Sequence, residues 1–418
     1  MVTRILILVA LVAALTGCEK RSTLYCEKNP DDLAHCDPPP DAPPPMMCAD
    51  NSSCTTEDRP FCQLDSHVCV ECLSNDDCHD PVKLNCDPLS FTCRGCSKHT
   101  DCPSNACLPG GLCGNDSQVI YLDPQNGVDT NSGTMGKPVK TWTKALSFVT
   151  DTRLYLKVTG TTNTSVVIDT KKVIVLADPG TKVIGSADPA FEIKKSQVKI
   201  VDLEIECPSA PMMDGLKSEM MSSTTLEHVY IHSCTKLGIN STEKFLAVSR
   251  SNIESNAGGG IATGANVDYV LTNNFIVHNG SASSMRGGVD LGSITLTNRF
   301  EFNTVAHNQI AGLLDGAGVT CAASLVNPLP LPNSLFVANT GGSGNISGGC
   351  TASGSTDTAN DAPLAFVNTT MAPYNYHIHD TSTAINAALT ATVVGDDIDG
   401  ELRPQGPNRD LGADELKQ

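Results

Sequence analysis

The stretch Ile276-Val-His-Asn279, followed by Gly288-Val289, is one copy of a pattern that recurs through the second half of the chain. The other copies are Ile253-Glu-Ser-Asn256 with Gly260-Ile261, Val305-Ala-His-Asn308 with Gly312-Leu313, Phe336-Val-Ala-Asn339, and an imperfect one, Ile231-His-Ser-Cys234 with Gly238-Ile239. Successive copies lie about 22 to 31 residues apart. A repeat of this length is typical of a solenoid, in which each coil stacks on the one before.

The apolar residue and the asparagine of the pattern each have a role in such a solenoid. One coil cannot bury its apolar residues alone, so stacking is expected to build a continuous core row from Ile231, Ile253, Ile276, Val305 and Phe336. Asparagine tolerates the left-handed backbone conformation at a sharp corner, and its amide can bond the asparagine of the next coil. We therefore predict an architectural ladder of Asn256, Asn279, Asn308 and Asn339.

The start of this region has a second pattern, which indicates a short helix. After the strand-like segment 119–122 and turns rich in Gly and Asn, the residues Trp142, Ala145, Leu146 and Val149 recur at helical spacing. The segment resembles the opening of right-handed parallel β-helix domains of the pectate-lyase-like superfamily, where a short amphipathic helix caps the open end. The resemblance implies an all-β fold: a right-handed parallel β-helix (three-sided solenoid) over residues 118–418, with Trp142 as the plug of its N-terminal cap.

The C-terminal stretch adds a further resemblance. Its motifs resemble the choice-of-anchor-type closing segment of many bacterial surface β-helix proteins, which ends the winding; they are Pro363-Leu-Ala-Phe-Val-Asn368, Tyr374-Asn-Tyr-His-Ile-His379, Thr383-Ala-Ile-Asn386, Asp397-Ile-Asp-Gly400 and Asp410-Leu-Gly-Ala-Asp-Glu415. The sequence departs from the usual form at Thr383 and between Asn386 and Asp396. These departures affect the length of the final coil, not the class.

Cysteine spacing predicts a separate region before the β-helix. Twelve cysteines fall into three rows, the first two offset by 24 residues: Cys48, Cys54, Cys62, Cys69; Cys72, Cys78, Cys86, Cys93; and Cys96, Cys102, Cys107, Cys113. We interpret residues 48–117 as three small cysteine-rich repeats, each held by disulfides because it is too short to bury a core. Four cysteines permit three pairings, so the connectivity stays open. Zinc is the rival interpretation, because Cys-x2-Cys recurs at Cys69/Cys72 and Cys93/Cys96.

The remaining cysteines also suit an oxidising compartment. Cys207 and Cys234 lie one coil apart, as do Cys321 and Cys350, so we predict that each pair bridges adjacent coils. Cys26 and Cys36 would pair separately. Setting aside Cys18, 18 of the 19 cysteines remain, an even number.

The N-terminus predicts export and anchoring. Residues 1–17 have Arg4, a short apolar run and small residues, as in a signal peptide. Leu15-Thr16-Gly17-Cys18 resembles the bacterial lipobox, which implies lipidation of Cys18; an ordinary signal peptide is the alternative. Residues 18–47 then form a lipid-anchored, Pro-rich linker. We expect an exported protein, anchored at the outer membrane or cell surface of a Gram-negative bacterium, and Glu19 favours the outer membrane over the inner one.

Composition excludes some functions. The formal charge of -18 argues against nucleic acid as a partner, since phosphate binding needs a surplus of Lys and Arg. Only 4% of the residues are aromatic, while Gly numbers 34, which suits short strands and turns better than a helical bundle. The expected partners are therefore the membrane, through the lipid, and a polysaccharide or surface protein.

Catalytic candidates are few. Arg286, Asp290, Asp315 and His278 form a conceivable lyase-like set, although ordinary solvated residues near glycine turns explain them as well. His278 and His307 should stack on adjacent coils, but without a third ligand in register they are expected to be structural, and we predict no metal site.

Asp396, Asp397 and Asp399 with Gly400 fail the twelve-residue calcium pattern. We therefore interpret them as a turn whose acids pair with Arg403 or Arg409. We expect no cofactor, with calcium as the one open alternative.

Two functions follow from these observations. The first is a non-catalytic surface lipoprotein that binds glycan or a protein partner, or has a structural role in the envelope. The alternative is a carbohydrate-active enzyme, a polysaccharide lyase or glycoside hydrolase, by analogy with the superfamily. A third hypothesis is that the cysteine-rich repeats are themselves ligand-binding or protease-inhibitor-like modules.

Overall fold

The computed structural model describes residues 48–80, 82–312, 314–323, 328–388 and 391–417. The signal peptide, Cys18, Cys26, Cys36 and the linker predicted for residues 18–47 lie outside these ranges. The chain divides into two compact units at Gly95/Cys96. The third cysteine-rich repeat therefore belongs to the same compact unit as the β-helix.

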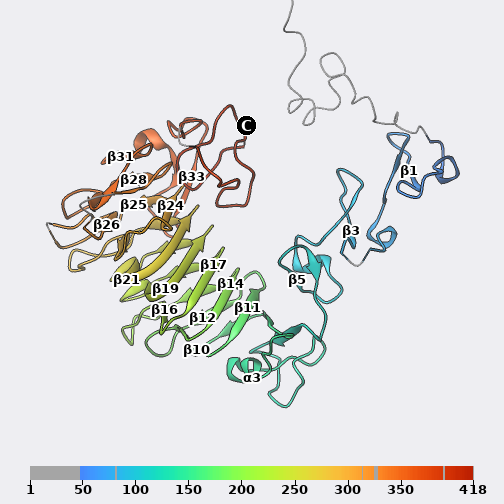
Figure 1. Ribbon diagram of the computed structural model, residues 1–418, viewed down its shortest axis with the longest axis horizontal. Helices are drawn as coiled ribbons and strands as arrows, with labels where there is room; N and C mark the ends of the chain where they lie inside the picture. Colours follow the sequence, from blue (N-terminus) through green and yellow to red (C-terminus); the bar gives the residue numbers. More distant parts are fainter. Residues whose placement is uncertain (1–47, 81, 313, 324–327, 389–390, 418) are drawn as a thin grey trace, which may run out of the picture. The chain divides into compact units, whose positions relative to one another are not determined.

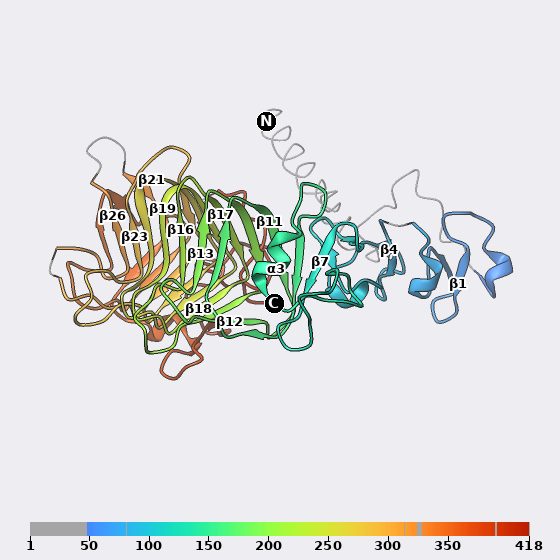
Figure 2. The ribbon, with the colours of Figure 1, turned by 90° about the horizontal axis from the view of Figure 1, so that it is seen from below.

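The second unit is a right-handed parallel β-helix with three faces, and its coils stack strand on strand (Figures 1 and 2). The first face holds β10 (Val166–Asp169), β13 (Phe191–Lys194), β16 (Leu216–Glu219), the starts of β19 (Leu237–Ser249) and β21 (Gly259–Thr272), β23 (Val289–Leu291), β26 (Val319–Cys321) and β29 (Ile346–Gly348). All of these neighbours pair in parallel.

The second and third faces complete each coil. The second holds β7 (Val119–Leu122), β8 (Tyr155–Val158), β11 (Lys172–Ala177), β14 (Gln197–Val201), β17 (Ser223–Glu227), the ends of β19 and β21, and β24 (Arg299–Glu301). The third holds β9 (Thr161–Thr162), β12 (Lys182–Ile184), β15 (Glu204–Glu206), β18 (Tyr230–His232), β20 (Asn252–Glu254), β22 (Phe275–Val277), β25 (Thr304–Ala306), β28 (Leu335–Val337) and β31 (Thr356–Thr358). A separate parallel pair joins β27 (Leu329–Pro330) to β30 (Cys350–Thr351).

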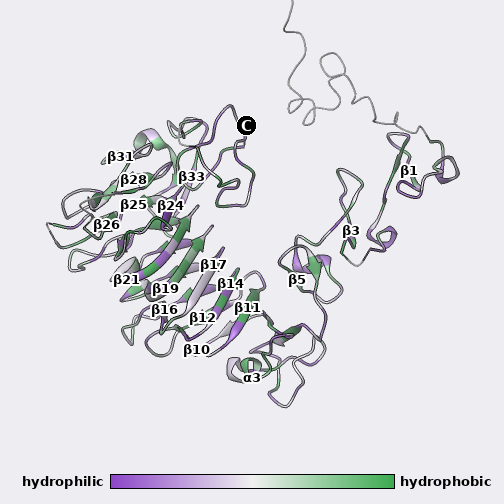
Figure 3. Ribbon diagram, viewed as in Figure 1, coloured by the Kyte–Doolittle hydropathy of each residue, from purple (hydrophilic) through white to green (hydrophobic). Residues whose placement is uncertain are grey.

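The predicted core row is present. Ile231, Ile253, Ile276, Val305 and Phe336 are register partners on successive coils, and all are fully buried. Figure 3 shows the hydrophobic residues concentrated on the strands of the coils. Stacking thus builds the aliphatic interior that no single coil could bury.

The asparagine ladder is also present, with one correction to its mechanism. Asn256, Asn279, Asn308 and Asn339 are joined by amide-to-amide hydrogen bonds of 2.8–3.1 Å. The left-handed residues are not these asparagines but the residues before them: Ser255, His278, His307 and Ala338, with φ of 50–56°. The preceding residue makes the turn, and this directs the asparagine side chain inward, where it bonds the neighbouring coil.

One copy of the repeat is aligned differently from the prediction. The glycine-aliphatic pair that follows Asn308 is Gly318-Val319, because Val319 is the register partner of Val289. Gly312 lies in the loop before β26, and Leu313 is outside the described residues. The prediction of Gly312-Leu313 was wrong, because a longer loop separates the ladder from the next strand in this coil.

The N-terminal end of the β-helix is capped by helix α3 (Trp142–Ser147). Trp142, Ala145 and Leu146 are buried, and the indole N–H of Trp142 donates to Thr162 Oγ1 at 3.0 Å. Trp142 also meets the ring of Phe191 edge-on. The tryptophan is therefore the plug of the cap that the helical spacing predicts. No helix within the described ranges is long and apolar enough to cross a membrane.

The C-terminal segment is described over residues 359–388 and 391–417. Its short helix η4 (Ala362–Leu364) and the antiparallel hairpin of β32 (Phe366–Asn368) and β33 (Asn375–Ile378) lie along the third face (Figure 1). Leu364, Tyr376 and Ile378 pack there against Phe275 and Val337. The segment thus follows the last coil, and it covers outward apolar side chains of the third face.

The disulfides fix the connectivity that the sequence left open. In each repeat the first cysteine pairs with the third and the second with the fourth: Cys48–Cys62, Cys54–Cys69, Cys72–Cys86, Cys78–Cys93, Cys96–Cys107 and Cys102–Cys113. Cys207–Cys234 and Cys321–Cys350 bridge adjacent coils. The zinc alternative is wrong for these residues, because Cys69 and Cys72, like Cys93 and Cys96, belong to different disulfides.

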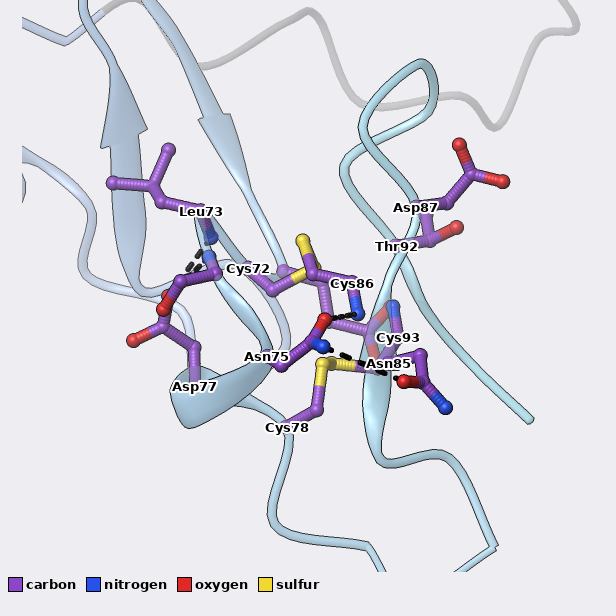
Figure 4. Close-up of a disulfide and its surroundings, with 12 residues drawn as sticks. Cys72, Leu73, Asn75, Asp77, Cys78, Asn85, Cys86, Asp87, Thr92 and Cys93 are labelled. Atoms are coloured by element: carbon purple, nitrogen blue, oxygen red, sulfur yellow. Dashed lines mark hydrogen bonds between the residues drawn. A yellow bond between two sulfur atoms is a disulfide. The ribbon is translucent and has the colours of Figure 1, made fainter. Parts of the chain in front are cut away.

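Each repeat is a small disulfide-bonded hairpin with a short helix. The pairs are β1 (Phe61–Gln63) with β2 (Val68–Val70), β3 (Asn85–Cys86) with β4 (Cys93–Arg94), and β5 (Cys107–Leu108) with β6 (Leu112–Cys113); the helices are η1 (Asn51–Ser53), η2 (Asn75–Asp77) and η3 (His99–Asp101). Figure 4 shows the second repeat, where Asn75 accepts from the Cys86 backbone N–H at 2.9 Å and Asp77 caps the turn at Leu73. Cystines and such local bonds replace an apolar core.

Candidate functional site: a groove along one corner of the β-helix

A groove with a volume of about 1010 Å³ runs along the corner between the second and third faces. Its floor comes from equivalent positions on five successive coils: residues 178–181, 201–204, 227–230, 250 and 252, and Phe275. Since neighbouring coils are spaced by about 4.8 Å, the floor is roughly 20 Å long. A groove of this kind suits an extended ligand with its own repeat.

Two segments distant in sequence form the walls. One is the third cysteine-rich repeat, which contributes residues 96–100 and 107–111. It is held on the β-helix by Ala106 and Leu108, which pack with Tyr121, and by the Tyr121 hydroxyl, which donates to the Ser104 carbonyl at 2.7 Å. The other wall is the C-terminal segment, with Pro373, Tyr374, Asn375, His377, Ile398 and Asp399.

Left-handed residues create the corner and aim its polar side chains. Asp202, His228 and Arg250 have φ of 51–64° and occupy the same turn on three consecutive coils. On each of these three coils a residue other than glycine makes the turn, because the chain must bend sharply here before its third-face strand. As a result, charged side chains from successive coils line up along the floor.

Ion pairs join the charged residues of the floor. Glu227 accepts from Lys199 at 2.5 Å and from Arg250. Burial by itself would raise the pKa of Glu227, but the hydrogen bond and charge of Lys199, with the charge of Arg250, hold that pKa below its usual value. Glu227 is therefore a stable carboxylate.

The histidines of the groove are paired in the same way. The hydrogen bond to Asp202 raises the pKa of His228, and the hydrogen bond to Asp399 raises the pKa of His377. His377 Nε2 lies 2.9 Å from Asp399, whose own pKa is lowered by that contact. By contrast, burial lowers the pKa of His99 in the opposite wall.

Tyr230 and Tyr374 are the tyrosines of the groove, and each has a histidine against one ring face. Tyr230 stacks on His232 with 4.2 Å between ring centroids, and Tyr374 stacks on His278 at 3.6 Å. The Tyr230 hydroxyl donates to Glu254 at 2.5 Å, which fixes the ring. Both rings are half-buried, so each has a supported orientation and an accessible part.

The structure separates the four catalytic candidates. Arg286 and Asp290 form an ion pair of 2.7 Å at β23, on the first face and away from the groove. The register partner of Asp290 on the next coil is Thr320, so no second acid faces it there. Asp315 lies in the loop before β26, where its carbonyl accepts from the Ser343 N–H.

His278 has a supporting role instead. It stacks on His307 with 5.1 Å between ring centroids, as the repeat predicts, and the C-terminal hairpin covers both rings. The Tyr376 hydroxyl hydrogen-bonds His307 Nδ1 at 2.6 Å and His278 Nε2 at 2.9 Å. This pair of imidazoles thus anchors the wall that contains Tyr374.

Two clusters of possible metal ligands lie next to the groove, and each already contains a basic group. Lys182 Nζ lies 2.7 Å from Glu204 and 2.8 Å from Glu206 in the cluster that His232 completes. In the other, His377 lies between Asp399 and Asp414 and has a raised pKa, which favours its protonated form. Lys182 and His377 thus pair with three of these acids, Glu204, Glu206 and Asp399, while burial raises the pKa of Asp414 to about 6.

The aspartates predicted to pair with Arg403 or Arg409 have other partners. Asp399 pairs with His377, and Asp397 Oδ1 accepts the backbone N–H groups of Asp399 and Glu401. Arg403 is fully buried and pairs with Glu415 at 2.9 Å instead. The prediction was wrong because the C-terminal segment folds Glu415 back into its own interior.

Sequence reasoning missed the groove, although one signal was present. Asp202, His228 and Arg250 recur at intervals of 26 and 22 residues, within the spacing of the coils, each two positions before a third-face strand. The residues of the two walls do not recur at the spacing of the coils, because they belong to segments outside the repeat.

Comparison with known proteins finds similarity to solved structures only. No family description and no curated protein sequence matches the chain. Among solved structures, it is similar to pectate lyase Pel9A, with 14% identity, a TM-score of 0.41, and coverage of 71% of this chain and 96% of that one. It is also similar to a rhamnogalacturonan lyase, with 12% identity, a TM-score of 0.31, and coverage of 58% and 86%. At this identity the likeness concerns the fold alone, and the assignment of a parallel β-solenoid rests on the strand pairing of the protein itself.

Proposed function

We propose that this protein is an exported, lipid-anchored β-helix protein that binds a glycan chain in the corner groove without cleaving it. The observation that supports the proposal most is the floor itself, which five successive coils build from equivalent positions, with polar side chains on four of them and the rings of Tyr230 and Phe275 on two. A polymer that repeats along its length can make similar contacts with each coil. Export agrees with the eight disulfides of the described residues, and Cys18 would carry the lipid.

Aromatic rings and fixed polar groups are the components of such a site. The apolar parts of Tyr230 and Tyr374 can pack against the C–H face of a sugar ring, while Asn252, His228 and the carboxylates bond its hydroxyl groups. Because the rings are held by His232, His278 and Glu254, little side-chain freedom is lost on binding.

Charge favours binding over hydrolysis. A glycoside hydrolase needs a carboxylic acid with a raised pKa to protonate the leaving group. In the groove, the pKa values of Glu204, Glu227 and Asp399 are lowered by their basic partners. These three residues are held as carboxylates, which accept hydrogen bonds from a ligand but do not supply a proton.

Substitution of the two tyrosines tests the proposal. Tyr230→Ala and Tyr374→Ala should each weaken glycan binding about three- to tenfold, from the ~0.5–1.5 kcal/mol typical of aromatic stacking. The measurement is affinity electrophoresis and calorimetry against a panel of neutral and acidic polysaccharides. Phe245→Ala is the matched control, since Phe245 is a half-buried aromatic of β19 that does not line the groove.

Two results would contradict the proposal. The first is the absence of binding to every polysaccharide of the panel. The second is the release of reducing or unsaturated sugar ends by the wild-type protein, which would favour the enzymatic alternative. Circular dichroism of each variant shows whether a loss of binding reflects a loss of fold.

A further inference from the structure

Each acidic side chain that lines the groove is paired with a basic side chain of the same protein. The pairs are Asp178 with Lys157, Asp202 with His228, Glu204 with Lys182, Glu227 with Lys199 and Arg250, and Asp399 with His377. The lining contains these five acids against three Lys or Arg residues, Lys98, Lys199 and Arg250. The groove therefore has many polar groups but no surplus of positive charge.

Glu227 is central to this balance. Its carboxylate, with 22% of its side chain exposed, pairs with both Lys199 and Arg250, which come from the strand before it and the corner after it. Arg250 also lies 3.9 Å from a second acid, Asp396. Lys199 and Arg250 are 31% and 27% exposed, so both reach the groove but neither is free to pair with a ligand. An anionic ligand would have to displace Glu227, which would leave that carboxylate half-buried and unpaired.

We infer that the groove selects an uncharged polysaccharide and rejects polyuronates. This inference rests on the proposed glycan-binding function and names the class of glycan. A polyuronate has one carboxylate on each sugar unit and needs unpaired cations at matching positions. Here Lys199 and Arg250 are already paired, Lys98 is a single lysine of one wall that cannot match a charge repeated along a polymer, and the five groove acids repel the polymer. The hydroxyl groups of a neutral glycan, by contrast, can donate to the outer oxygens of these ion pairs without breaking them.

The substitution Glu227→Gln tests this inference. It keeps the shape of the side chain but releases Lys199 and Arg250 from a negative charge. Binding is measured by calorimetry with a neutral hexasaccharide that the wild-type protein binds and with hexagalacturonate. The wild-type protein should bind hexagalacturonate at least about tenfold more weakly than the neutral sugar. The variant should gain about tenfold for hexagalacturonate but gain nothing for the neutral sugar, whose hydroxyl groups lose a carboxylate acceptor.

Glu192→Gln is the matched control. Glu192 forms a similar ion pair, with Lys194 at 2.8 Å, but on the first face and outside the groove. It should change the binding of neither sugar. A second measurement needs no variant: neutral-glycan binding by the wild-type protein should be unchanged from about 0.05 to 0.5 M salt, because no ligand charge is screened.

The outcomes separate the inference from the proposed function. Binding of hexagalacturonate as tight as that of the neutral sugar, a variant without gain, or strongly salt-dependent neutral-sugar binding would overturn the inference alone. If the wild-type protein binds no saccharide at all, both the proposed function and the inference are overturned.

Discussion

At the scale of single residues, the coils are joined by buried amides. Asn279 is fully buried; its Nδ2 donates to the Ile253 carbonyl at 2.8 Å and to Asn308 at 3.1 Å, while its Oδ1 accepts from Asn256. A second ladder, unforeseen from the repeat, joins Asn274 to Asn303 at 2.9 Å at the corner that leads into the third face. Each amide satisfies backbone groups that a sharp corner leaves without strand partners.

Substitution of Asn279 tests the role of the ladder. Asn279→Ala should lower the free energy of unfolding by about 1–3 kcal/mol, because it leaves buried partners on both neighbouring coils unsatisfied. Denaturant unfolding followed by circular dichroism measures the change. Asn163→Ala, at an exposed position, is the control. Equal stability of the two variants would show that the ladder is not stabilising.

At the scale of elements, the C-terminal segment is a lateral cover for the third face. Its hairpin places Tyr374 on His278 and Tyr376 between His278 and His307. The Thr369 carbonyl can only accept, so it receives the Nε2–H of His278 at 3.0 Å. Burial under the cover lowers the pKa of both His278 and His307, which favours their neutral forms. The cover also positions one wall of the groove.

The titration of His278 tests this arrangement. Burial, together with the nearby His307, lowers the pKa of His278 to about 4. In an NMR titration, His278 should therefore stay neutral down to about pH 4. His228 is the internal control, because its hydrogen bond to Asp202 raises its pKa above the ordinary value. A His278 that titrates at or above pH 6.5 would contradict the buried contact.

The same shift predicts how this contact responds to acid. A histidine of an unfolded chain is protonated near pH 6.5, whereas His278 in the folded protein is protonated only near pH 4. The stability that depends on neutral His278 is therefore complete above about pH 6.5 and is lost as the pH falls toward 4. Asp414 has the opposite effect, since burial raises its pKa to about 6 and favours folding as the pH falls through that value. Because the effects of His278 and Asp414 on stability oppose each other, only a probe that is specific to one of these residues separates them.

At the scale of the whole molecule, two kinds of core stabilise the two units. In the first unit, the buried hydrophobic cluster of the first repeat is made of Cys48, Cys54, Cys62 and Cys69 alone. In the second unit, a continuous aliphatic interior runs from Ile120 to Phe336, and two disulfides add to it. Covalent bonds replace burial in the first unit, as expected for repeats too short to bury a core.

Reduction should distinguish the two units. After treatment with reductant and alkylation under native conditions, residues 48–95 should become sensitive to protease, while the β-helix should survive as a large fragment. Mass spectrometry of the fragments and circular dichroism of the remaining strands measure this. The untreated protein is the control. Equal sensitivity of both units would show that the β-helix also depends on its disulfides.

The sequence by itself determined the β-helix, its core row, the cap helix and the disulfides between coils. The core row and these disulfides join residues one coil apart, so the spacing of the repeat predicts which residues are neighbours in space. The cap helix followed instead from its helical spacing and from the resemblance of this segment to known β-helix domains. Only the tertiary structure decided the pairing within each cysteine-rich repeat and the lateral course of the C-terminal segment.

The groove also belongs to the tertiary structure. Lys98, Glu227 and Tyr374 come from three segments with no common spacing, and they line one groove because two other surfaces, around Tyr121 and around Phe275, needed apolar cover. Such packing depends on the shapes of folded surfaces. A linear pattern does not encode them, so the walls of the site appeared only once the chain was folded.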